Sequence, residues 1–135
     1  MKLTSSQRQR LIAAARAASR ASYAPYSKFR VGAAVLTRSG RIFSGCNVEN
    51  ASYGLANCAE RTAIFSAIAA GDRGIVAVAV YTPTSAPTTP CGACRQVINE
   101  FNPQASIICA CRTRRRIETR LDQLLPEAFG PKNLL

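Results

Sequence analysis

Apolar positions recur along this chain with two different periods, and the periods predict alternating helices and strands. Apolar residues at helical spacing, bounded by capping and stop residues, predict helices over 4–22, 58–72 and 91–101. Two almost continuous apolar runs, 74–82 and 105–111, are typical of strands that are buried on both faces of a sheet. The regular alternation of the two patterns indicates an α/β protein.

The remaining segments complete the predicted order of elements. An apolar run, a turn at Ser39-Gly40 and a second short strand predict a hairpin over 29–45. The charged segment 114–120 predicts an edge strand, and 121–130 a last short helix and tail. We therefore expect a three-layer α/β/α sandwich around a mixed sheet of about five strands. With no internal repeat and no linker, residues 1–135 are expected to form one domain.

The stretch between the hairpin and the second helix shows no clean period. Residues 46–57, "CNVENASYGLAN", mix polar and aromatic side chains. This composition predicts a loop, and loops on a rigid scaffold commonly carry binding groups.

Composition narrows the class of protein. Hydrophobic residues make up 47% of the 135, which excludes an intrinsically disordered chain. We find no secretory signal and no apolar run of about 20 residues that would span a membrane. These features predict a cytoplasmic protein, in which the six cysteines serve metal binding or catalysis rather than disulfides.

The charge balance raises a nucleic-acid hypothesis. The chain has 18 basic and seven acidic residues, no histidine, and a formal net charge of +11. The arginines are spread along the first helix and are dense only in 111–120, "CRTRRRIETR". This distribution favours a solvated basic face and a charged edge strand that hinders sheet-to-sheet pairing.

The cysteines gather at predicted helix starts. "CGAC" alone is compatible with a zinc site, a redox pair or two buried thiols. Pro90 places Cys91 and Cys94 in the first turn of one helix, and Cys58 begins another. Because helix N-termini offer free N–H groups and a positive dipole end, both positions favour thiolates, and zinc becomes the preferred interpretation.

The number of thiols bears on the kind of zinc site. Three protein ligands leave one position open, as in catalytic sites, whereas a fourth thiol from Cys46, Cys109 or Cys111 would close a structural site. Glu60, in the first turn after Cys58, is able to reach the open face and to act as a general acid and base. A glutamate early in a helix is also explained by the dipole alone, but beside three thiols it favours catalysis.

Several blocks of the sequence carry a family resemblance. "CAE" followed by "PCGAC" resembles the zinc nucleoside and nucleobase deaminases, in which three cysteines are an accepted ligand set. The chain is similar over most of its length to the small homotetrameric cytidine deaminases, through "YAPYSKFRVGAAV", "GCNVENASYG", "CAERTAI", "PCGACRQVINEF" and "LLPEAFGP".

The resemblance implies an activity and a role for each matching residue. It implies hydrolytic deamination of free cytidine and deoxycytidine in pyrimidine salvage, with one Zn²⁺ per subunit and Glu60 as proton shuttle. The implied zinc ligands are Cys58, Cys91 and Cys94, and the implied substrate contacts are Phe29, Asn47, Glu49, Ala51, Tyr53, Ala59 and Phe129. Ala51, Tyr53 and Phe129 would reach a neighbouring subunit's site in a homotetramer. The resemblance implies that Arg61 hydrogen-bonds the thiolates. Arg95, which follows Cys94, is expected either to act similarly or to be a surface arginine of its helix.

Three other functions stay open. The same zinc chemistry would serve a deaminase of an aminonucleoside antibiotic such as blasticidin S, although the blocks above are closer to cytidine deaminase. The charge favours a deaminase of cytosine in RNA or DNA, but little chain is left to form an oligonucleotide channel. A zinc-stabilised binding module is the alternative outside enzymology, and it requires a fourth protein ligand.

Overall fold

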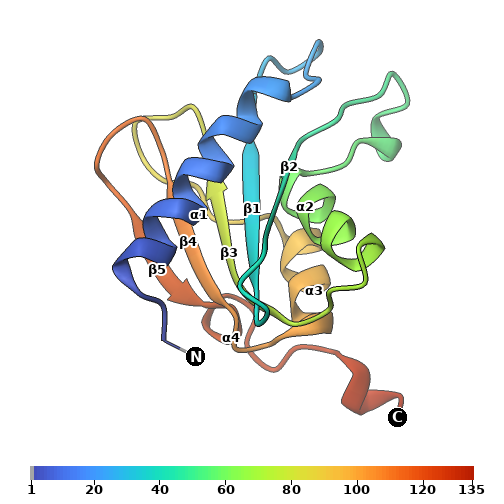
Figure 1. The fold of residues 1–135 in the computed structure, drawn as a ribbon. Coiled ribbons are helices and arrows are strands. Elements are labelled where there is room, and N and C mark those ends of the chain that lie inside the picture. The colour runs from blue at the N-terminus through green and yellow to red at the C-terminus, as the bar shows by residue number, and fades with distance from the viewer. Residues whose placement is uncertain (1) are drawn as a thin grey trace.

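The computed structural model describes residues 2–135 and shows one mixed sheet between two layers of helices (Figure 1). Its strands lie in the order β2-β1-β3-β4-β5, with β3 and β4 parallel and all other neighbours antiparallel. Their bounds are β1 Gly32–Thr37, β2 Ile42–Cys46, β3 Ile75–Tyr81, β4 Ser106–Ala110 and β5 Ile117–Arg120. The predicted mixed sheet of about five strands is confirmed.

The helices cover both faces of this sheet. Helix α1 lies on one face, and α2 and α3 lie side by side on the other (Figure 1). The helices are α1 Ser5–Ala18, α2 Ala59–Ala69, α3 Gly92–Phe101 and α4 Leu121–Leu124, with 3₁₀ turns η1 Ser19–Ala21, η2 Tyr53–Leu55 and η3 Pro131–Asn133. The predicted three-layer sandwich is therefore confirmed.

The two-residue period of the central strands divides the core into two halves. In β1, Val35 faces α2 and α3, whereas its neighbours Ala34 and Leu36 face α1. In β3, every residue is buried, because both faces of this strand are covered. This burial explains why β3 reads in the sequence as an unbroken apolar run.

Two glycines allow the helices to lie directly on the sheet. A Cβ atom added to Gly32 would lie 1.8 Å from the backbone oxygen of Ala15 in α1. A Cβ atom at Gly45 would lie 2.5 Å from the backbone nitrogen of Ala63 in α2. The absence of a side chain at Gly45 thus sets the position of α2, which begins next to Cys58.

Some element boundaries differ from the prediction. Strand β1 begins at Gly32 rather than in the segment 29–31, and β5 begins only at Ile117, after an exposed loop. Residues 46–57 are more ordered than the predicted loop, because Val48 bridges to both Tyr23 and Asn57. In the described part of the chain, every helix is too short or too polar to cross a membrane.

Candidate active site

Two helices begin at the same point, and each begins with a cysteine. Cys58 is the N-cap of α2 and Cys91 is the N-cap of α3, and neither side chain forms a capping hydrogen bond with a backbone N–H of its helix. The third thiol, Cys94, lies in the first turn of α3 and is fully buried. The first-turn N–H groups of both helices are therefore directed at a cluster of thiols, where they favour negative charge on sulfur.

The sulfur positions fit a zinc ion. The three Sγ atoms lie within 4.8 Å of one another, and the Sγ atoms of Cys58 and Cys91 are 3.7 Å apart. Thiolates around a tetrahedral zinc, with Zn–S bonds of about 2.3 Å, are separated by about 3.8 Å. In residues 2–135 this is the one group of three or more potential metal-ligating side chains, and no fourth ligand belongs to it. The donor set thus leaves one coordination position free.

The thiols share negative charge unequally. The hydrogen bond from Cys94, assisted by Arg61, holds the pKa of Cys58 well below its ordinary value. The same bond, together with burial and the nearby charge of Glu60, raises the pKa of Cys94. Because zinc binds thiolates, its arrival displaces the remaining thiol protons, so zinc affinity depends on pH.

Arg61 stands beside the sulfur atoms as their nearest cation. Its Nη2 donates to the Sγ of Cys58 at 3.4 Å, and this bond raises the pKa of the guanidinium. Its Nε is buried and has no hydrogen-bond partner in residues 2–135. A buried donor without a partner next to thiols is suited to a more negative cluster than the metal-free one, as three thiolates on zinc would provide.

Glu60 brings a carboxylate into the same space. It lies in the first turn of α2 and is only 5% exposed. Burial, and secondarily the charge of Cys58, raises the pKa of Glu60, against hydrogen bonds that lower it. A carboxyl group whose pKa moves towards neutrality is able both to accept and to return a proton.

A cleft of about 200 Å³ opens over this group. It brings together the predicted contacts Phe29, Asn47 and Ala59 with Glu60 and two of the thiols. Sequence reasoning missed five further lining residues: Val31, Val80, Thr82, Thr88 and Thr89. Their positions in the sequence could have indicated them as lining residues. Val80 and Thr82 lie at the carboxyl end of β3, and Thr88 and Thr89 directly precede Pro90-Cys91.

Asn47 is engaged with protein backbone as well as with the cleft. Its Oδ1 accepts from the backbone N–H of Val31 at 2.9 Å and from Ser22, and its Nδ2 donates to the carbonyl of Phe29 at 2.7 Å. These bonds fix the segment that presents Phe29. One amide hydrogen of Asn47 stays free for a ligand.

Glu49 lies in a neighbouring hollow rather than in the zinc cleft. That hollow is lined by Glu49, Tyr26, Ser27 and Tyr53 among others. The Glu49 carboxylate accepts from Ser27 Oγ and from the backbone N–H groups of Tyr26 and Ser27, and these bonds, the Ser27 hydroxyl first, lower its pKa. They stabilise the turn in which Lys28 has a φ of 61°, a conformation that costs about 1 kcal/mol outside glycine.

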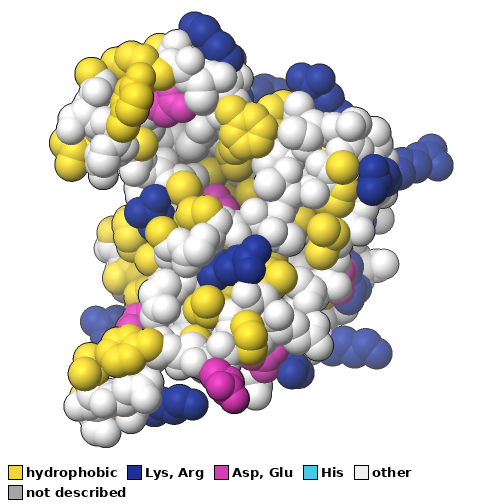
Figure 2. Space-filling model, turned by 180° about the vertical axis from the view of Figure 1, so that it is seen from behind, with side chains coloured by type: hydrophobic (Ala, Val, Ile, Leu, Met, Phe, Trp, Pro, Cys, Tyr) yellow, Lys and Arg dark blue, Asp and Glu magenta, His cyan; other side chains and the backbone are white. Residues whose placement is uncertain are grey.

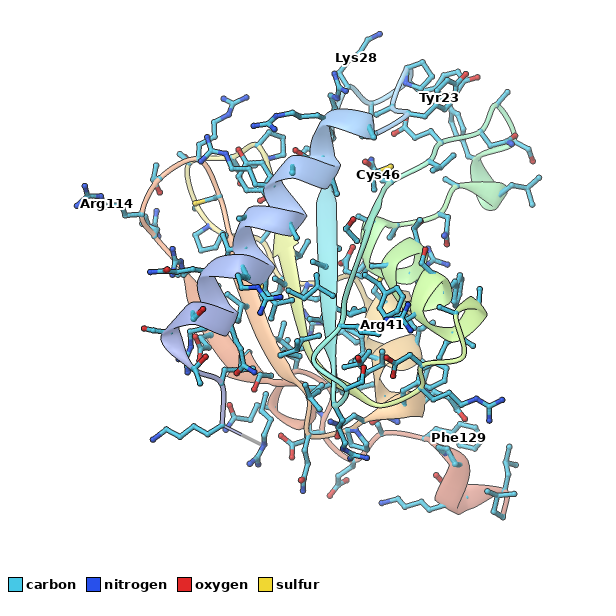
Figure 3. All side chains as sticks on the ribbon, viewed as in Figure 1. Tyr23, Lys28, Arg41, Cys46, Arg114 and Phe129 are labelled. Carbon is cyan, nitrogen blue, oxygen red and sulfur yellow. The ribbon has the colours of Figure 1, made fainter. Side chains whose placement is uncertain are left out.

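Besides Glu49, three further predicted substrate contacts lie outside the cleft of their own chain. Neither Ala51 nor Tyr53 lines it, and Tyr53 is 77% exposed. Phe129 lies on the C-terminal segment, near the opposite end of the molecule from Cys46 (Figure 3), and its carbonyl accepts from Gln96 and Asn99.

The other cysteines and Arg95 are occupied elsewhere. Cys46, Cys109 and Cys111 are not part of the sulfur group, and the Cys111 thiol bonds oxygens of Ser85, Thr113 and Arg115 instead. Arg95 does not bond a thiol; it donates to the carbonyls of Pro90 and Leu124 and to Thr89. Arg95 thus ties the start of α3 to the last helix.

Comparison with known proteins agrees with this arrangement. The family model "Cytidine and deoxycytidylate deaminase zinc-binding region" matches residues 5–111. The chain belongs to this deaminase family. The predicted resemblance, the zinc-dependent hydrolase class and the zinc cofactor are thereby confirmed, since the family's zinc-binding region contains the one sulfur group of the described chain.

Individual members of the deaminase family resemble the chain over almost its full length. The cytidine deaminase of Sporosarcina psychrophila is 46% identical over 127 residues, covering 93% of each chain. That of Halalkalibacterium halodurans is 47% identical over 128 residues, covering 94% of this chain and 97% of the relative. The crystal structure of cytidine deaminase from Burkholderia pseudomallei superimposes with a TM-score of 0.88 at 51% identity, covering 94% of this chain and all of that one.

Proposed function

We propose that this chain hydrolyses free cytidine and deoxycytidine to uridine and deoxyuridine with release of ammonia, a reaction of pyrimidine salvage. The observation that supports this most directly is the meeting of three thiols and the buried carboxylate of Glu60 in one cleft, beside Phe29. The relatives named cytidine deaminase support the choice of substrate.

The three thiols provide a site for the metal that this chemistry needs. Cys58, Cys91 and Cys94 would hold Zn²⁺, which would supply the Lewis acid that lowers the pKa of a water molecule. Three thiolates give the zinc cluster a net charge of −1, which weakens that effect. The guanidinium of Arg61 and the two helix N-termini draw off part of this charge.

Glu60 moves the protons of the reaction. A carboxylate oxygen of Glu60 accepts a proton from the attacking water and delivers it to N3 of the cytosine ring. The water oxygen forms the new bond to C4 and keeps its second proton as a hydroxyl. Glu60 then takes that hydroxyl proton and gives it to the exocyclic amine, so that C4=O forms, the C4–N bond breaks and ammonia leaves.

Residues around the cleft orient the nucleoside. Phe29 packs against the base, the backbone of Ala59 holds the pyrimidine carbonyl, and the free amide hydrogen of Asn47 reaches the ribose. Glu49 contributes to ribose binding from the adjoining hollow. Because a nucleoside is neutral, this binding needs hydrogen bonds and stacking rather than net charge.

Self-association supplies the residues that the cleft lacks. Ala51, Tyr53 and Phe129 contribute to a neighbouring subunit's site in a homotetramer. Apolar side chains are exposed in the parts that would meet: Tyr53, Leu55 and Phe129 are 77%, 70% and 61% accessible. Figure 2 shows hydrophobic side chains gathered on the face that bears α2 and α3, near residues 46–57 and near the C-terminal segment.

The proposal is tested by following the ultraviolet absorbance of cytidine on addition of zinc-loaded protein. Wild type converts cytidine, and Glu60→Gln and Glu60→Ala retain zinc but turn over at least about 10²-fold more slowly, the usual contribution of a general acid and base. Near-normal turnover by zinc-loaded Glu60→Gln would remove Glu60 from the mechanism. A flat trace from zinc-loaded wild type would overturn cytidine as the substrate and direct the search to other amino-pyrimidine nucleosides.

A further inference from the structure

The proposed reaction leaves the positive charge of the chain unexplained, and the fold gathers much of that charge on one side. Helix α1 and the turn after it present Arg8, Arg10, Arg16 and Arg20, and this segment contains no acidic residue. Three of these arginines are exposed, and Arg8 is half-buried. The charged side chains of α1 and of the turn after it are therefore all basic.

The second basic segment is the loop between β4 and β5. It carries Arg112, Arg114, Arg115 and Arg116, all exposed, with a single threonine among them. Figure 3 shows Arg114 projecting outward from this loop, away from the body of the molecule. Four like charges so close together repel one another, which destabilises the free protein and favours an anionic partner.

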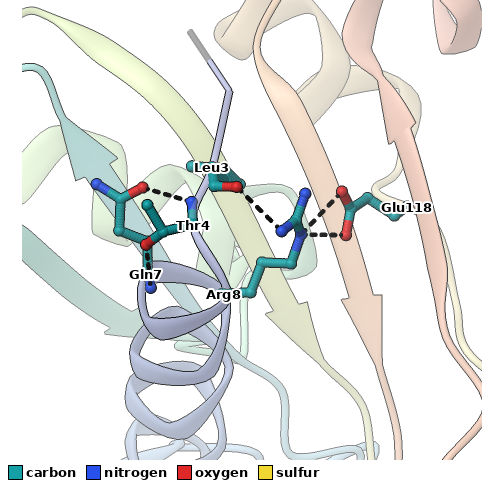
Figure 4. Close-up of polar contacts among 5 residues, drawn as sticks. All are labelled: Leu3, Thr4, Gln7, Arg8 and Glu118. Atoms are coloured by element: carbon teal, nitrogen blue, oxygen red, sulfur yellow. Dashed lines mark hydrogen bonds and ion pairs between the residues drawn. The ribbon is translucent and has the colours of Figure 1, made fainter.

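Two contacts hold α1 against the strands next to this loop, although the segments are far apart in the sequence. The Arg8 Nε donates to both carboxylate oxygens of Glu118 in β5, at 2.9 and 3.1 Å (Figure 4). At the other end of α1, the guanidinium carbon of Arg16 lies 5.5 Å above the ring of Tyr81. Tyr81 pairs with Ala110, the last residue of β4 before the loop. The two arginine groups therefore form one surface, which we call the arginine face.

The charges of the arginine face are mostly unpaired. Among residues 2–135 the ion pairs are Arg8 with Glu118 and Arg120 with Asp122. Seven of the eight arginines of the face thus lack a carboxylate partner. An exposed, unpaired row of guanidinium groups is suited to the phosphates of a nucleic-acid backbone, which they bind with two parallel hydrogen bonds.

The arginine face also adjoins the wall of the cleft. The backbone N–H of Arg112 donates to the carbonyl of Thr84 at 2.9 Å, and Thr113 Oγ1 donates to the carbonyl of Ser85 at 2.9 Å. The loop that contains Thr84 and Ser85 follows β3 and continues to Thr88 and Thr89, which line the cleft. The arginines of the β4–β5 loop thus adjoin the segment that forms one wall of the cleft, and a basic surface there is not required by a neutral nucleoside.

We propose that the arginine face binds the phosphodiester backbone of single-stranded nucleic acid, independently of the deamination of free nucleosides. Binding is electrostatic and without base preference, because the face is made of arginines and lacks exposed aromatic rings for stacking in its two segments. Its strength therefore falls steeply with salt.

The test uses zinc-loaded protein and a fluorescent oligouridine of about 20 nucleotides, longer than a typical single-strand site. Oligouridine contains no cytosine, so its binding does not depend on the cleft. Fluorescence anisotropy is compared for wild type, for the variant with Arg112, Arg114, Arg115 and Arg116 changed to alanine, and for a matched control. The control removes the same number of charges elsewhere: Arg38, Arg41, Arg73 and Lys132 to alanine.

The face variant is expected to lose at least about tenfold in affinity at low salt, and its log–log salt slope to fall by about 3, because each phosphate contact on a single strand contributes about 0.7. Between about 50 and 200 mM salt, wild-type affinity then falls about 50-fold more than that of the variant. The control keeps most of the affinity, and both variants keep the wild-type rate with cytidine. That rate is an independent measurement, so failure of the deaminase proposal is recognised separately.

Three results would overturn the proposal: no binding of oligouridine at low salt, an equal loss in the control, or binding of vesicles with anionic lipids but not of oligonucleotides. The first leaves the face without a nucleic-acid role, and the second attributes binding to net charge alone. Oligothymidine is measured alongside. Equal affinity for both strands supports backbone recognition, and preference for RNA supports it with an added contact to the 2′-hydroxyl.

Discussion

The start of α1 and the start of α2 solve the same physical problem in different ways. Every helix begins with N–H groups that have no partner inside the helix. In α1, Thr4 Oγ1 accepts from the N–H of Gln7 at 3.1 Å, and the Gln7 side chain accepts from the N–H of Thr4 at 2.9 Å (Figure 4). In α2, Cys58 occupies the same position and forms no such bond.

The comparison extends to the two ends of α2 itself. Its last turn is closed, because the N–H groups of Ala70, Gly71 and Asp72 all bond helix carbonyls, with Gly71 at a φ of 84°. Its first turn leaves N–H groups for the thiols and Glu60. At the end of α2 that has no proposed role in chemistry, the backbone groups therefore bond within the chain. At the end near the cleft, N–H groups stay available to a metal site and a substrate.

Cys58→Ser tests this contrast with the largest expected effect. Serine is a good N-cap, so the metal-free variant should be more stable than metal-free wild type by about 0.5–1 kcal/mol. A hydroxyl is a poor substitute for a thiolate as a zinc ligand, so zinc affinity should fall by more than about 100-fold. This loss exceeds the one usually seen when a residue that only hydrogen-bonds a ligand is changed. Zinc titration and denaturant unfolding in chelator measure the two effects.

The matched control is Cys46→Ser, which changes a half-buried thiol outside the sulfur group. It should keep zinc and activity. If Cys58→Ser bound zinc as tightly as this control, Cys58 would not be a ligand, and its uncapped position would need another explanation.

Gly45→Ala tests whether the start of α2 is positioned by the close packing of this helix on Gly45 of β2. The new Cβ would meet the backbone of α2 at 2.5 Å, so the helix has to shift or the strand has to bend. We expect destabilisation of about 3 kcal/mol, and a fall in kcat/KM of about 100-fold from displacing Glu60. Gly74→Ala is the matched control, since its added Cβ would make only ordinary contacts with Arg38, at 3.4 Å and beyond. Equal melting temperatures and rates for the two variants would show that α2 is not positioned by Gly45.

The sequence predicted well what depends on neighbouring residues. The apolar runs of β3 and β4 and the Pro90-Cys91 helix start are local signals, and the structure has them where expected. The thiol cluster could also be predicted from the sequence, because its cysteines lie at helix starts and resemble a known motif. The roles of these ligands stay predictions until they are tested.

What the sequence concealed depends on contacts between distant segments. Glu49 was assigned to the ribose, yet its carboxylate accepts from Tyr26 and Ser27, and only the fold shows that these donors face it. In the sequence, the arginines of α1 are scattered. They lie near the β4–β5 loop because of the ion pair between Arg8 and Glu118, which are 110 residues apart and which only the fold brings together. Strand order was likewise not readable from local pattern.

Thr4→Ala tests the closed start of α1. It removes the capping bond and should cost about 1 kcal/mol, or about 4 °C in melting temperature. Zinc content and kcat/KM should be unchanged, because α1 lies on the other face of the sheet from the cysteines. Thr4→Ser, which keeps the hydroxyl, should retain most of the stability. A loss of activity in Thr4→Ala at temperatures where it is folded would contradict the separation of the two faces.

Asp72→Asn tests the side-chain link between the end of α2 and the β1–β2 turn, and has the smallest expected effect. Asp72 Oδ2 accepts from Thr37 Oγ1 at 2.7 Å and from Ser39 Oγ at 2.8 Å, and these bonds lower the pKa of Asp72. A lowered folded-state pKa means that the stabilisation is fully present above the unfolded value of about 3.9 and is lost as pH falls through the folded value. The wild type should therefore melt above the variant near neutral pH, and the two curves should converge in acid. Ser39→Ala should reduce the gap by removing one donor. A gap that persisted unchanged at pH values well below the folded-state pKa of Asp72 would mean that the carboxylate does not stabilise this link.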